Sequence, residues 1–188
     1  MWTLANILTL TRIALIPCFV VFYYLPIPYS YIISAIIFGI AIVTDWLDGF
    51  VARYLDQESS LGEFLDPVAD KLMVAIVLVV VLQSQPYLWM TLPVAIIIGR
   101  EIAISALREW MAQAGLQKKV AVSRLGKWKT GFQMVSLILL VIGQSDVSAY
   151  INWLGVVLLY IAASLTLWSM GKYLSAALPD ILEGKVKG

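Results

Sequence analysis

The sequence predicts an all-α integral membrane protein with six transmembrane helices. Of its 188 residues, 61% are hydrophobic and only 13% are charged, and the mean hydropathy is +0.89. These values lie well beyond those of ordinary soluble domains. Apolar stretches long enough to cross a bilayer recur along the chain, separated by short connections. We expect one membrane domain over residues 1–178 and a short polar cytoplasmic tail over residues 179–188.

The charge balance and the cysteine content exclude two classes of protein. Thirteen basic and 12 acidic residues nearly cancel, so the chain has no basic surface of the kind that binds nucleic acid. A single cysteine, Cys18, excludes an internal disulfide framework.

The first predicted span covers residues 6–25. We interpret it as an uncleaved helix because no basic region precedes the apolar run and Arg12 lies inside it. Asn6, Thr9 and Arg12 recur every three residues and therefore share one side of the helix. In one interpretation these residues cap the helix and the arginine reaches the membrane–water interface. In the other they form the edge of a nucleotide-binding site.

Two carboxylate-bearing spans follow. Pro26 and Pro28 end the first helix, and the second and third spans are predicted over residues 29–52 and 63–83. Pro67 would then fall in the first turn of the third helix, where a missing backbone donor is tolerated.

The fourth span is predicted over residues 88–108 and ends in a charged run. Arg100 and Arg108 lie eight residues apart on one stripe, and Glu101 and Glu109 occupy the adjacent stripe. A solvated helix end explains Glu109 easily. It explains Arg100 and Glu101 poorly, because they directly follow an apolar run.

The last two spans are predicted over residues 130–142 and 150–174. A polar, basic connection over residues 111–129 precedes the fifth span, and we expect residues 120–125 within it to form an interfacial helix. Pro179 is expected to end the ordered chain.

The distribution of cations predicts the orientation. The connections around residues 26–30, 84–87 and 143–149 contain no Lys or Arg, whereas the alternate connections hold nearly all of them. By the positive-inside rule, both termini, the turn after the second span and the basic connection face the cytoplasm.

Four carboxylates are concentrated on the second and third spans. Asp45 and Asp48 are three residues apart, and Asp66 and Asp70 are four apart, so each pair shares a helix face. The two pairs lie at similar depths on either side of the turn. We therefore predict that the four acids converge.

Converging acids inside a membrane need neutralising charge. The chain has no histidine, so an all-oxygen site favours Mg²⁺ or Mn²⁺, and two such ions could clamp a phosphoryl group. The alternative is ion pairing of the acids with Arg53, Lys71 or Arg100.

This region resembles the motif of the CDP-alcohol phosphatidyltransferases, D-x-x-D-G-x-x-A-R, eight residues, then G-x-x-x-D-x-x-x-D. The resemblance implies a membrane enzyme that cleaves the pyrophosphate of a CDP-linked lipid, releases CMP and joins the phosphatidyl group to an alcohol. The residues that match are Asp45, Asp48, Gly49, Ala52, Arg53, Gly62, Asp66 and Asp70.

The resemblance also implies roles. The four aspartates would hold two Mg²⁺ or Mn²⁺ ions, with Asp70 also acting as the general base. Gly49, Ala52, Arg53 and Gly62 would contact the CDP-diacylglycerol.

Cations on the fourth and fifth spans suit an anionic acceptor. Arg100, Arg108, Arg124, Lys127 and Lys129 make this region too positive for choline or ethanolamine. We expect Arg100, Arg108 and Lys127 to bind the phosphate of a phosphorylated alcohol, which resemblance to bacterial members of the family implies to be sn-glycerol 3-phosphate. The alternative for the lysines is contact with anionic lipids.

Longer segments resemble bacterial members of the family that use this acceptor. The expected reaction converts CDP-diacylglycerol and sn-glycerol 3-phosphate to phosphatidylglycerophosphate and CMP, at the cytoplasmic side of the bacterial inner membrane. Membrane lipids are expected partners, and the family often forms homodimers. Two other hypotheses stay open: a family member with a different acceptor, such as inositol phosphate or phosphatidylglycerol, and a divalent-cation transporter.

Overall fold

In a computed structural model that describes residues 4–55, 60–113, 124–145 and 149–182, the chain forms six α-helices. Within these ranges, residues 4–5, 48–55, 60–61, 63, 124–128 and 176–182 are described by their backbone alone. The helices are α1 (Leu4–Tyr24), α2 (Ser30–Leu55), α3 (Ser60–Ser84), α4 (Leu88–Gln113), α5 (Arg124–Ile142) and α6 (Ala149–Leu182).

The expected all-helical architecture is confirmed, but several helices are longer than predicted. α4 continues five residues past Arg108, and α5 begins at Arg124, which joins the last part of the predicted interfacial helix to the fifth span. The rest of that interfacial prediction lies outside the described residues. α6 runs through Pro179 to Leu182, because a proline so close to a helix end removes only one hydrogen bond near the terminus.

The predicted start of the third helix was wrong. α3 begins at Ser60, so Pro67 lies inside the helix and not in its first turn. The S-x-x-E pattern of Ser60 and Glu63 is typical of a helix start and could have indicated this earlier boundary. Pro67 leaves the Glu63 carbonyl without its usual helical donor.

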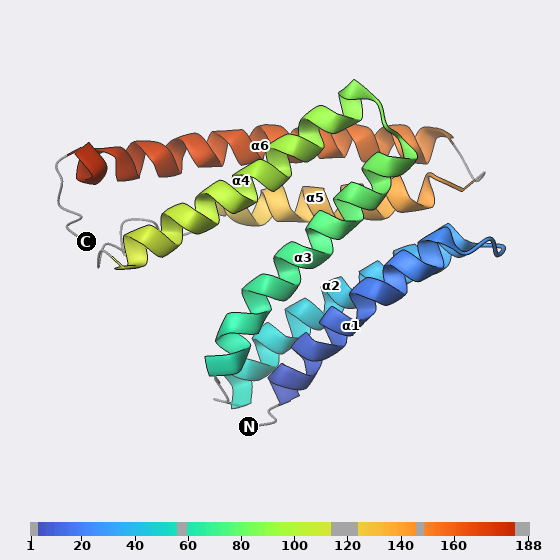
Figure 1. Cartoon of the computed structure of the whole chain (residues 1–188), viewed down its shortest axis with the longest axis horizontal. Helices are drawn as coiled ribbons and strands as arrows, with labels where there is room; N and C mark the ends of the chain where they lie inside the picture. The colour runs from blue at the N-terminus through green and yellow to red at the C-terminus, as the bar shows by residue number, and fades with distance from the viewer. Residues whose placement is uncertain (1–3, 56–59, 114–123, 146–148, 183–188) are drawn as a thin grey trace.

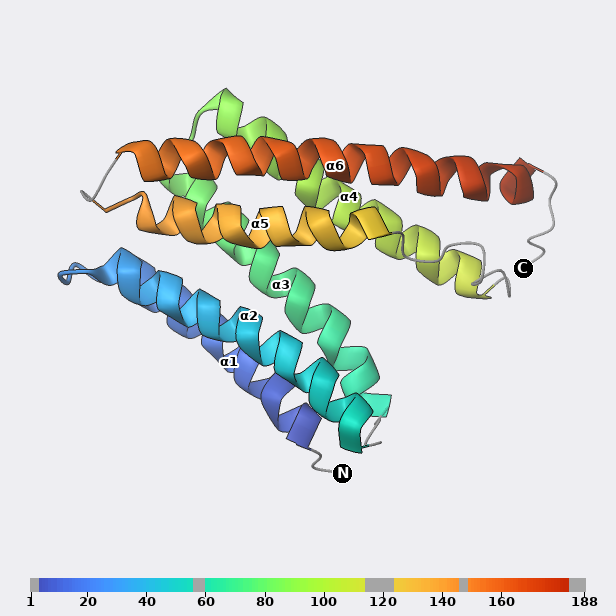
Figure 2. The ribbon, with the colours of Figure 1, turned by 180° about the vertical axis from the view of Figure 1, so that it is seen from behind.

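The helices form two groups (Figures 1 and 2). In the first group, α1 packs against both α2 and α3. In the second, α6 packs against α4 and α5, while contacts of α2 and α3 with α5 and of α3 with α4 join the groups. The groups lie close together at one end and diverge at the other, where the starts of α1 and α3 and the end of α2 are separated from the C-terminal half of α4.

A continuous apolar core connects all six helices. Fully buried side chains such as Phe19, Phe38 and Leu78 fill it from the first group, and Ile97 and Leu159 fill it from the second. Burial of each such side chain contributes roughly 1.5–3 kcal/mol relative to exposure in water, and membrane helices also rely on close packing.

Glycines allow α5 and α6 to approach closely. A Cβ on Gly155 would lie 2.9 Å from the side chain of Leu140 and 3.1 Å from its backbone nitrogen. The Ser136 hydroxyl of α5 donates a 2.7 Å hydrogen bond to the Gly155 carbonyl. A larger residue at position 155 would push these helices apart.

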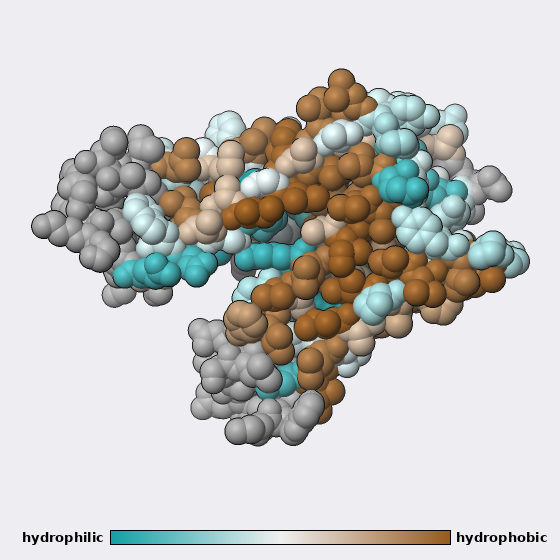
Figure 3. Space-filling model, in the orientation of Figure 1, coloured by the Kyte–Doolittle hydropathy of each residue, from teal (hydrophilic) through white to brown (hydrophobic). Residues whose placement is uncertain are grey.

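The outer surface is largely apolar, as Figure 3 shows for one face. Large side chains such as Ile36, Val79, Ile102 and Val157 are more than half exposed. By length and composition, the described part of the chain contains four helices able to cross a membrane, namely α1, α2, α4 and α6. The apolar part of α5, Lys129–Ile142, is shorter.

Candidate functional site

Arg12 of α1 joins the carboxylates of α2 and α3. Its Nη1 lies 2.9 Å from Oδ1 of Asp45 and also donates a short hydrogen bond to Oδ1 of Asp70. One turn earlier, the Thr9 hydroxyl donates a 2.5 Å hydrogen bond to Oδ1 of Asp66. The polar side of α1 therefore contacts an acid of each predicted pair. We call Thr9, Arg12, Asp45, Asp66 and Asp70 the carboxylate site.

The polar stripe of α1 is buried along its length. Asn6, Thr9 and Arg12 are at most 1% exposed, and their three-residue spacing directs them all toward α2 and α3. Arg12 therefore points into the protein and does not reach outward to the membrane interface. Burial of a guanidinium requires anionic partners, and Asp45 and Asp70 supply them.

The carboxylates are more accessible than the arginine between them. The side chains of Asp45 and Asp70 are 44% and 45% exposed, against 2% for Arg12. The site is thus closed by α1 on one side and open on the other, which would admit a ligand to the carboxylate oxygens.

The structure brings three of the four predicted acids against α1. Among the described side chains, no group of three acidic, histidine or cysteine residues is close enough to form a ready metal cluster. The side chains of Asp48, Ala52 and Arg53 lie outside the described part, and the backbones of these residues and of Gly49 belong to α2. The buried Gly62 lies in the first turn of α3.

The residues nonetheless fit a divalent cation. A single positively charged group, Arg12 Nη1, is contacted by one oxygen from α2 and one from α3. A hard cation at that point would meet carboxylate oxygens from both helices, the donor type that Mg²⁺ and Mn²⁺ prefer. The sequence left ion pairing of the acids with Arg53, Lys71 or Arg100 as an alternative. The structure places Arg12 against Asp45 and Asp70, and the Arg53 side chain lies outside the described part.

A second polar group lies between α4, α5 and α6. The Glu101 carboxylate accepts a short hydrogen bond from Arg100 Nη1, and its Oε1 also lies 3.4 Å from Nζ of Lys129. Arg100 Nη2 donates to the Ser169 hydroxyl at 3.4 Å. We call Arg100, Glu101, Lys129 and Ser169 the cation cluster.

The cation cluster is buried and incompletely satisfied. Arg100 and Lys129 are 8% and 4% exposed. Among the described residues, the buried atoms Arg100 Nε and Thr166 Oγ1 have no hydrogen-bond partner. A buried donor without a partner is unfavourable, so an anionic ligand near Arg100 would remove an existing penalty.

Glu101→Gln should destabilise the protein, because Arg100 and Lys129 would lose the charge between them. We expect the free energy of unfolding to fall by roughly 1.5–3 kcal/mol, the range for a hydrogen bond to a charged group. Chemical unfolding in detergent would measure it. Glu109→Gln, an exposed glutamate two turns along α4, is the matched control and should change stability by less than about 0.5 kcal/mol. Equal effects of the two substitutions would contradict the contacts assigned to Glu101.

The predicted acceptor residues lie in different environments. Arg100 is in the cation cluster, whereas Arg108, two turns along the same face of α4, is exposed. Both cations are near enough to Lys129 to repel its charge. The side chain of Lys127 lies outside the described part, and Lys129 is the α5 lysine that the structure places beside Arg100. Sequence reasoning noted Lys129 but did not select it.

A cleft separates the two helix groups where they diverge, and the two polar groups belong to different helix groups. The carboxylate site lies at the end of α1, α2 and α3 that diverges from α4 (Figure 1). Figure 3 shows the molecule hollowed between the two helix groups, with hydrophilic side chains along the α4 wall. An acidic group on one helix group and a basic group on the other suit a substrate with a metal-bound phosphate and a second, separately bound anion.

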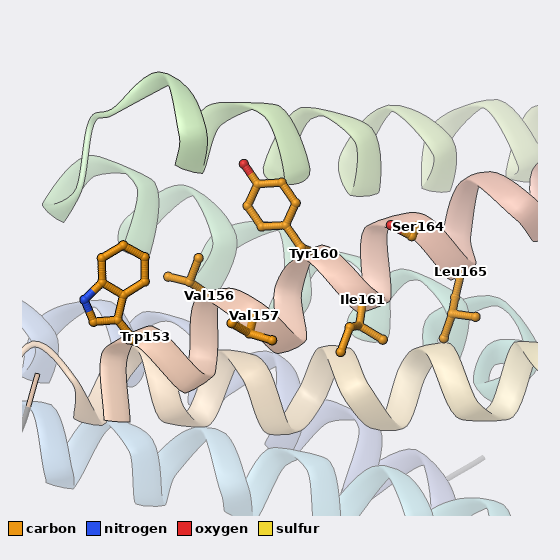
Figure 4. Close-up of a pocket in the computed structure, with 7 residues that line it drawn as sticks. All are labelled: Trp153, Val156, Val157, Tyr160, Ile161, Ser164 and Leu165. Atoms are coloured by element: carbon orange, nitrogen blue, oxygen red, sulfur yellow. The ribbon is translucent and has the colours of Figure 1, made fainter. Parts of the chain in front are cut away.

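Two grooves outside this cleft are apolar. Figure 4 shows the larger one along α6, where the Tyr160 hydroxyl donates to the Trp89 carbonyl at 2.6 Å. Such a surface suits an acyl chain or another helix, not phosphate chemistry. Its lining residues are Trp153, Val156, Val157, Tyr160, Ile161, Ser164 and Leu165.

Comparison with known proteins agrees with the motif. A family model described as CDP-alcohol phosphatidyltransferase matches residues 2–186. The chain is 50% identical over 182 residues to the CDP-diacylglycerol–glycerol-3-phosphate 3-phosphatidyltransferases of Escherichia coli (strain K12), Salmonella typhimurium (strain LT2) and Shigella flexneri. Each match covers 97% of this chain and 98% of the relative. With its matching motif on α2 and α3, the chain belongs to the CDP-alcohol phosphatidyltransferase family.

Proposed function

We propose that this protein transfers the phosphatidyl group of CDP-diacylglycerol to sn-glycerol 3-phosphate, giving phosphatidylglycerophosphate and CMP. The observation that carries the proposal is the presence of a carboxylate site on α1, α2 and α3 and a separate cation cluster on α4, α5 and α6. The relatives named for this reaction support it, because they share half of their residues with this chain over nearly its whole length.

The carboxylate side of the cleft would hold the CDP-lipid. Asp45, Asp48, Asp66 and Asp70 would ligate two divalent cations, Mg²⁺ or Mn²⁺, which when bound neutralise charge that develops on the pyrophosphate. We assign the nucleotide end to the backbone and side chains around the motif on α2 and α3, that is Gly49, Ala52, Arg53 and Gly62.

Asp70 is the proposed general base. It removes the proton from the 1-hydroxyl of sn-glycerol 3-phosphate while that oxygen attacks the lipid-bearing phosphorus. The new phosphorus–oxygen bond forms as the bond to the CMP oxygen breaks, and CMP leaves with the electron pair. Positioning of the hydroxyl against Asp70 allows a weak base to suffice.

The cation side of the cleft would hold the acceptor phosphate. The buried Nε of Arg100 has no hydrogen-bond partner among the described residues and could donate to the phosphate. Lys129 contacts the same Glu101 carboxylate as Arg100. Arg108 and Lys127 would extend this positive region toward solvent. A guanidinium binds phosphate through two parallel donors, which favours a phosphorylated alcohol over an uncharged one.

The protein would lie in the membrane with its cleft toward the cytoplasm. All six helices would span the inner membrane of a bacterium, with both termini on the cytoplasmic side and residues 179–188 as a polar tail after a single domain over residues 1–178. The length and apolarity of α1, α2, α4 and α6 support the first part of this arrangement. The cation-free connections on one side support the orientation. A homodimer is compatible with the apolar outer surface.

CMP release by the purified protein tests the function. CDP-diacylglycerol would be supplied in detergent micelles with Mg²⁺ or Mn²⁺, and the acceptor would be sn-glycerol 3-phosphate, inositol phosphate, phosphatidylglycerol or glycerol. We expect sn-glycerol 3-phosphate to give the highest kcat/KM and chelation of divalent ions to stop the reaction. A higher kcat/KM with another acceptor would reject the assigned substrate.

Arg108→Ala should raise the KM for sn-glycerol 3-phosphate about ten- to hundredfold, because one charge-assisted contact of roughly 1.5–3 kcal/mol is lost. Arg108→Lys should be nearly as harmful, since an ammonium cannot reproduce bidentate binding. The KM for CDP-diacylglycerol should change little. Steady-state CMP release with each substrate varied in turn measures both constants.

The control is Lys172→Ala, which removes an exposed cation of α6 that lies over the Trp168 ring and is assigned to neither substrate. It should leave both KM values unchanged. If Arg108→Ala weakened the CDP-lipid and spared the acceptor, the division of the cleft into two halves would be wrong.

A further inference from the structure

Arg12 contacts the atoms that a metal ion would need. Its Nη1 lies between Oδ1 of Asp45 and Oδ1 of Asp70, which come from the two helices that carry the family motif. The family motif does not include Arg12, which reaches the site from α1. The mechanism proposed above gives it no role.

Arg12 Nη1 lies at the point between the two carboxylate oxygens where a metal ion held by both would lie. A guanidinium nitrogen in hydrogen-bond contact with both carboxylates occupies the space in which a cation bridging α2 and α3 would lie. A divalent ion there would also repel the positive charge of Arg12 at short range. Metal and guanidinium therefore exclude each other at this point.

Burial holds Arg12 in contact with the carboxylates. The residue is 1% exposed, so its charge cannot be stabilised by water and depends on the carboxylates. Thr9 differs, because its hydroxyl contact with Asp66 carries no charge and competes far less with a cation. Within the α1 stripe, Arg12 is thus the residue that can oppose metal binding.

We propose that Arg12 is an internal counter-cation that competes with the divalent metal for Asp45 and Asp70 and so determines the metal affinity of the site. The inference rests on the proposed function in one respect, namely that these aspartates are metal ligands. At low metal concentration, Arg12 would then neutralise the charge of Asp45 and Asp70. A divalent ion must displace Arg12 to bind.

Calorimetric titration of Mn²⁺ into the purified full-length protein in detergent, with no lipid substrate, tests the proposal. If Arg12 leaves the carboxylates about one-tenth of the time, its removal tightens the apparent Kd about tenfold, because an affinity is reduced by the competent fraction. Arg12→Gln should show this tightening. Arg12→Lys keeps the charge without the planar fork, and its Kd should lie between those of Arg12→Gln and the parent protein.

Lys71→Gln is the matched control. Lys71 is an exposed cation directly after Asp70, so its removal changes the nearby charge without touching the contacts of Arg12. Its Kd should stay within about twofold of the parent value, since exposed charges are screened. A tightening equal to that of Arg12→Gln would show a general field effect and overturn the proposal.

A second readout is the rise in melting temperature on addition of Mn²⁺. Removal of Arg12 leaves the carboxylates to repel one another in metal-free protein, so the rise should be larger for Arg12→Gln than for the parent. An unchanged or weaker Kd for Arg12→Gln would overturn the proposal and would mean that Arg12 only positions the carboxylates. If Arg12→Gln does not fold, a Kd for Arg12→Lys that is no tighter than the parent value overturns the proposal as well. A parent protein that binds no Mn²⁺ would reject the metal site of the proposed function itself, and this inference with it.

Discussion

Asp66→Asn is expected to abolish detectable CMP release. The substitution removes an anionic ligand while keeping the size of the side chain, so the two-metal site loses charge and the pyrophosphate loses its anchor. The amide oxygen of the substituted side chain could still accept the hydrogen bond from Thr9, so the packing of α1 against α3 should persist. The melting temperature of metal-free protein should therefore not fall, and it should rise if repulsion among the acids is relieved.

The control for Asp66→Asn is Asp146→Asn, in the connection between α5 and α6 at the opposite end of the proposed membrane arrangement. It should retain full activity. An Asp66→Asn enzyme with a near-normal rate in the presence of a chelator would remove the basis for assigning a metal to this site.

Asp70→Asn is expected to lower kcat by about 10²- to 10⁴-fold, the usual contribution of a positioned general base. An amide cannot take the proton of the acceptor hydroxyl. The KM for CDP-diacylglycerol should change much less, because Asp45, Asp48 and Asp66 remain to hold the metal ions at its pyrophosphate. Single-turnover and steady-state measurements of CMP release would separate the chemical step from binding.

The pH dependence gives an independent check on Asp70. The acidic limb of the kcat profile reports the base in the enzyme–substrate complex, so Asp70→Asn should lose that limb. Asp70→Glu keeps a carboxylate and should retain the limb at a reduced rate. A loss of kcat in Asp70→Asn of about threefold or less, far below the usual contribution of a general base, would assign the base elsewhere and leave Asp70 as a ligand only.

The helices were largely predictable because apolar runs must be as long as the bilayer is thick. The ends of the helices were less predictable. The start of α5 at Arg124 occurs in polar sequence, where hydrophobic length marks no boundary. The end of α6 at Leu182 was missed because Pro179 was expected to end the ordered chain. The start of α3 at Ser60 was missed because a proline is most easily accommodated in the first turn of a helix, which favoured a start close to Pro67. The capping pattern of Ser60 and Glu63 indicated the earlier start.

The site was predictable to the level of helix faces. Spacing placed Asp66 with Asp70 on one face, and Asn6, Thr9 and Arg12 on one side of the first helix. Which cation would meet the acids was not predictable, because Arg12 and Asp70 are 58 residues apart and their contact depends on how α1 packs against α3. Tertiary packing decides such pairs.

The cation cluster shows the same limit in the second helix group. Arg100 and Arg108 share a stripe of α4, yet one is buried against Ser169 of α6 and the other is exposed. Helical periodicity relates the two residues to each other but not to their neighbours. The contact of Lys129 with Glu101 likewise depends on how α5 faces α4.

The most direct test of the account is the position of bound metal. Crystals of the protein grown with Mn²⁺ and CDP-diacylglycerol would be measured at the manganese absorption edge. We predict two anomalous peaks about 3.5–4 Å apart, between Asp45, Asp48, Asp66 and Asp70, with the Arg12 guanidinium displaced from Asp45 and Asp70. Manganese peaks elsewhere, with Arg12 still joining α2 to α3, would contradict the assignment of this site as a two-metal phosphoryl-transfer centre.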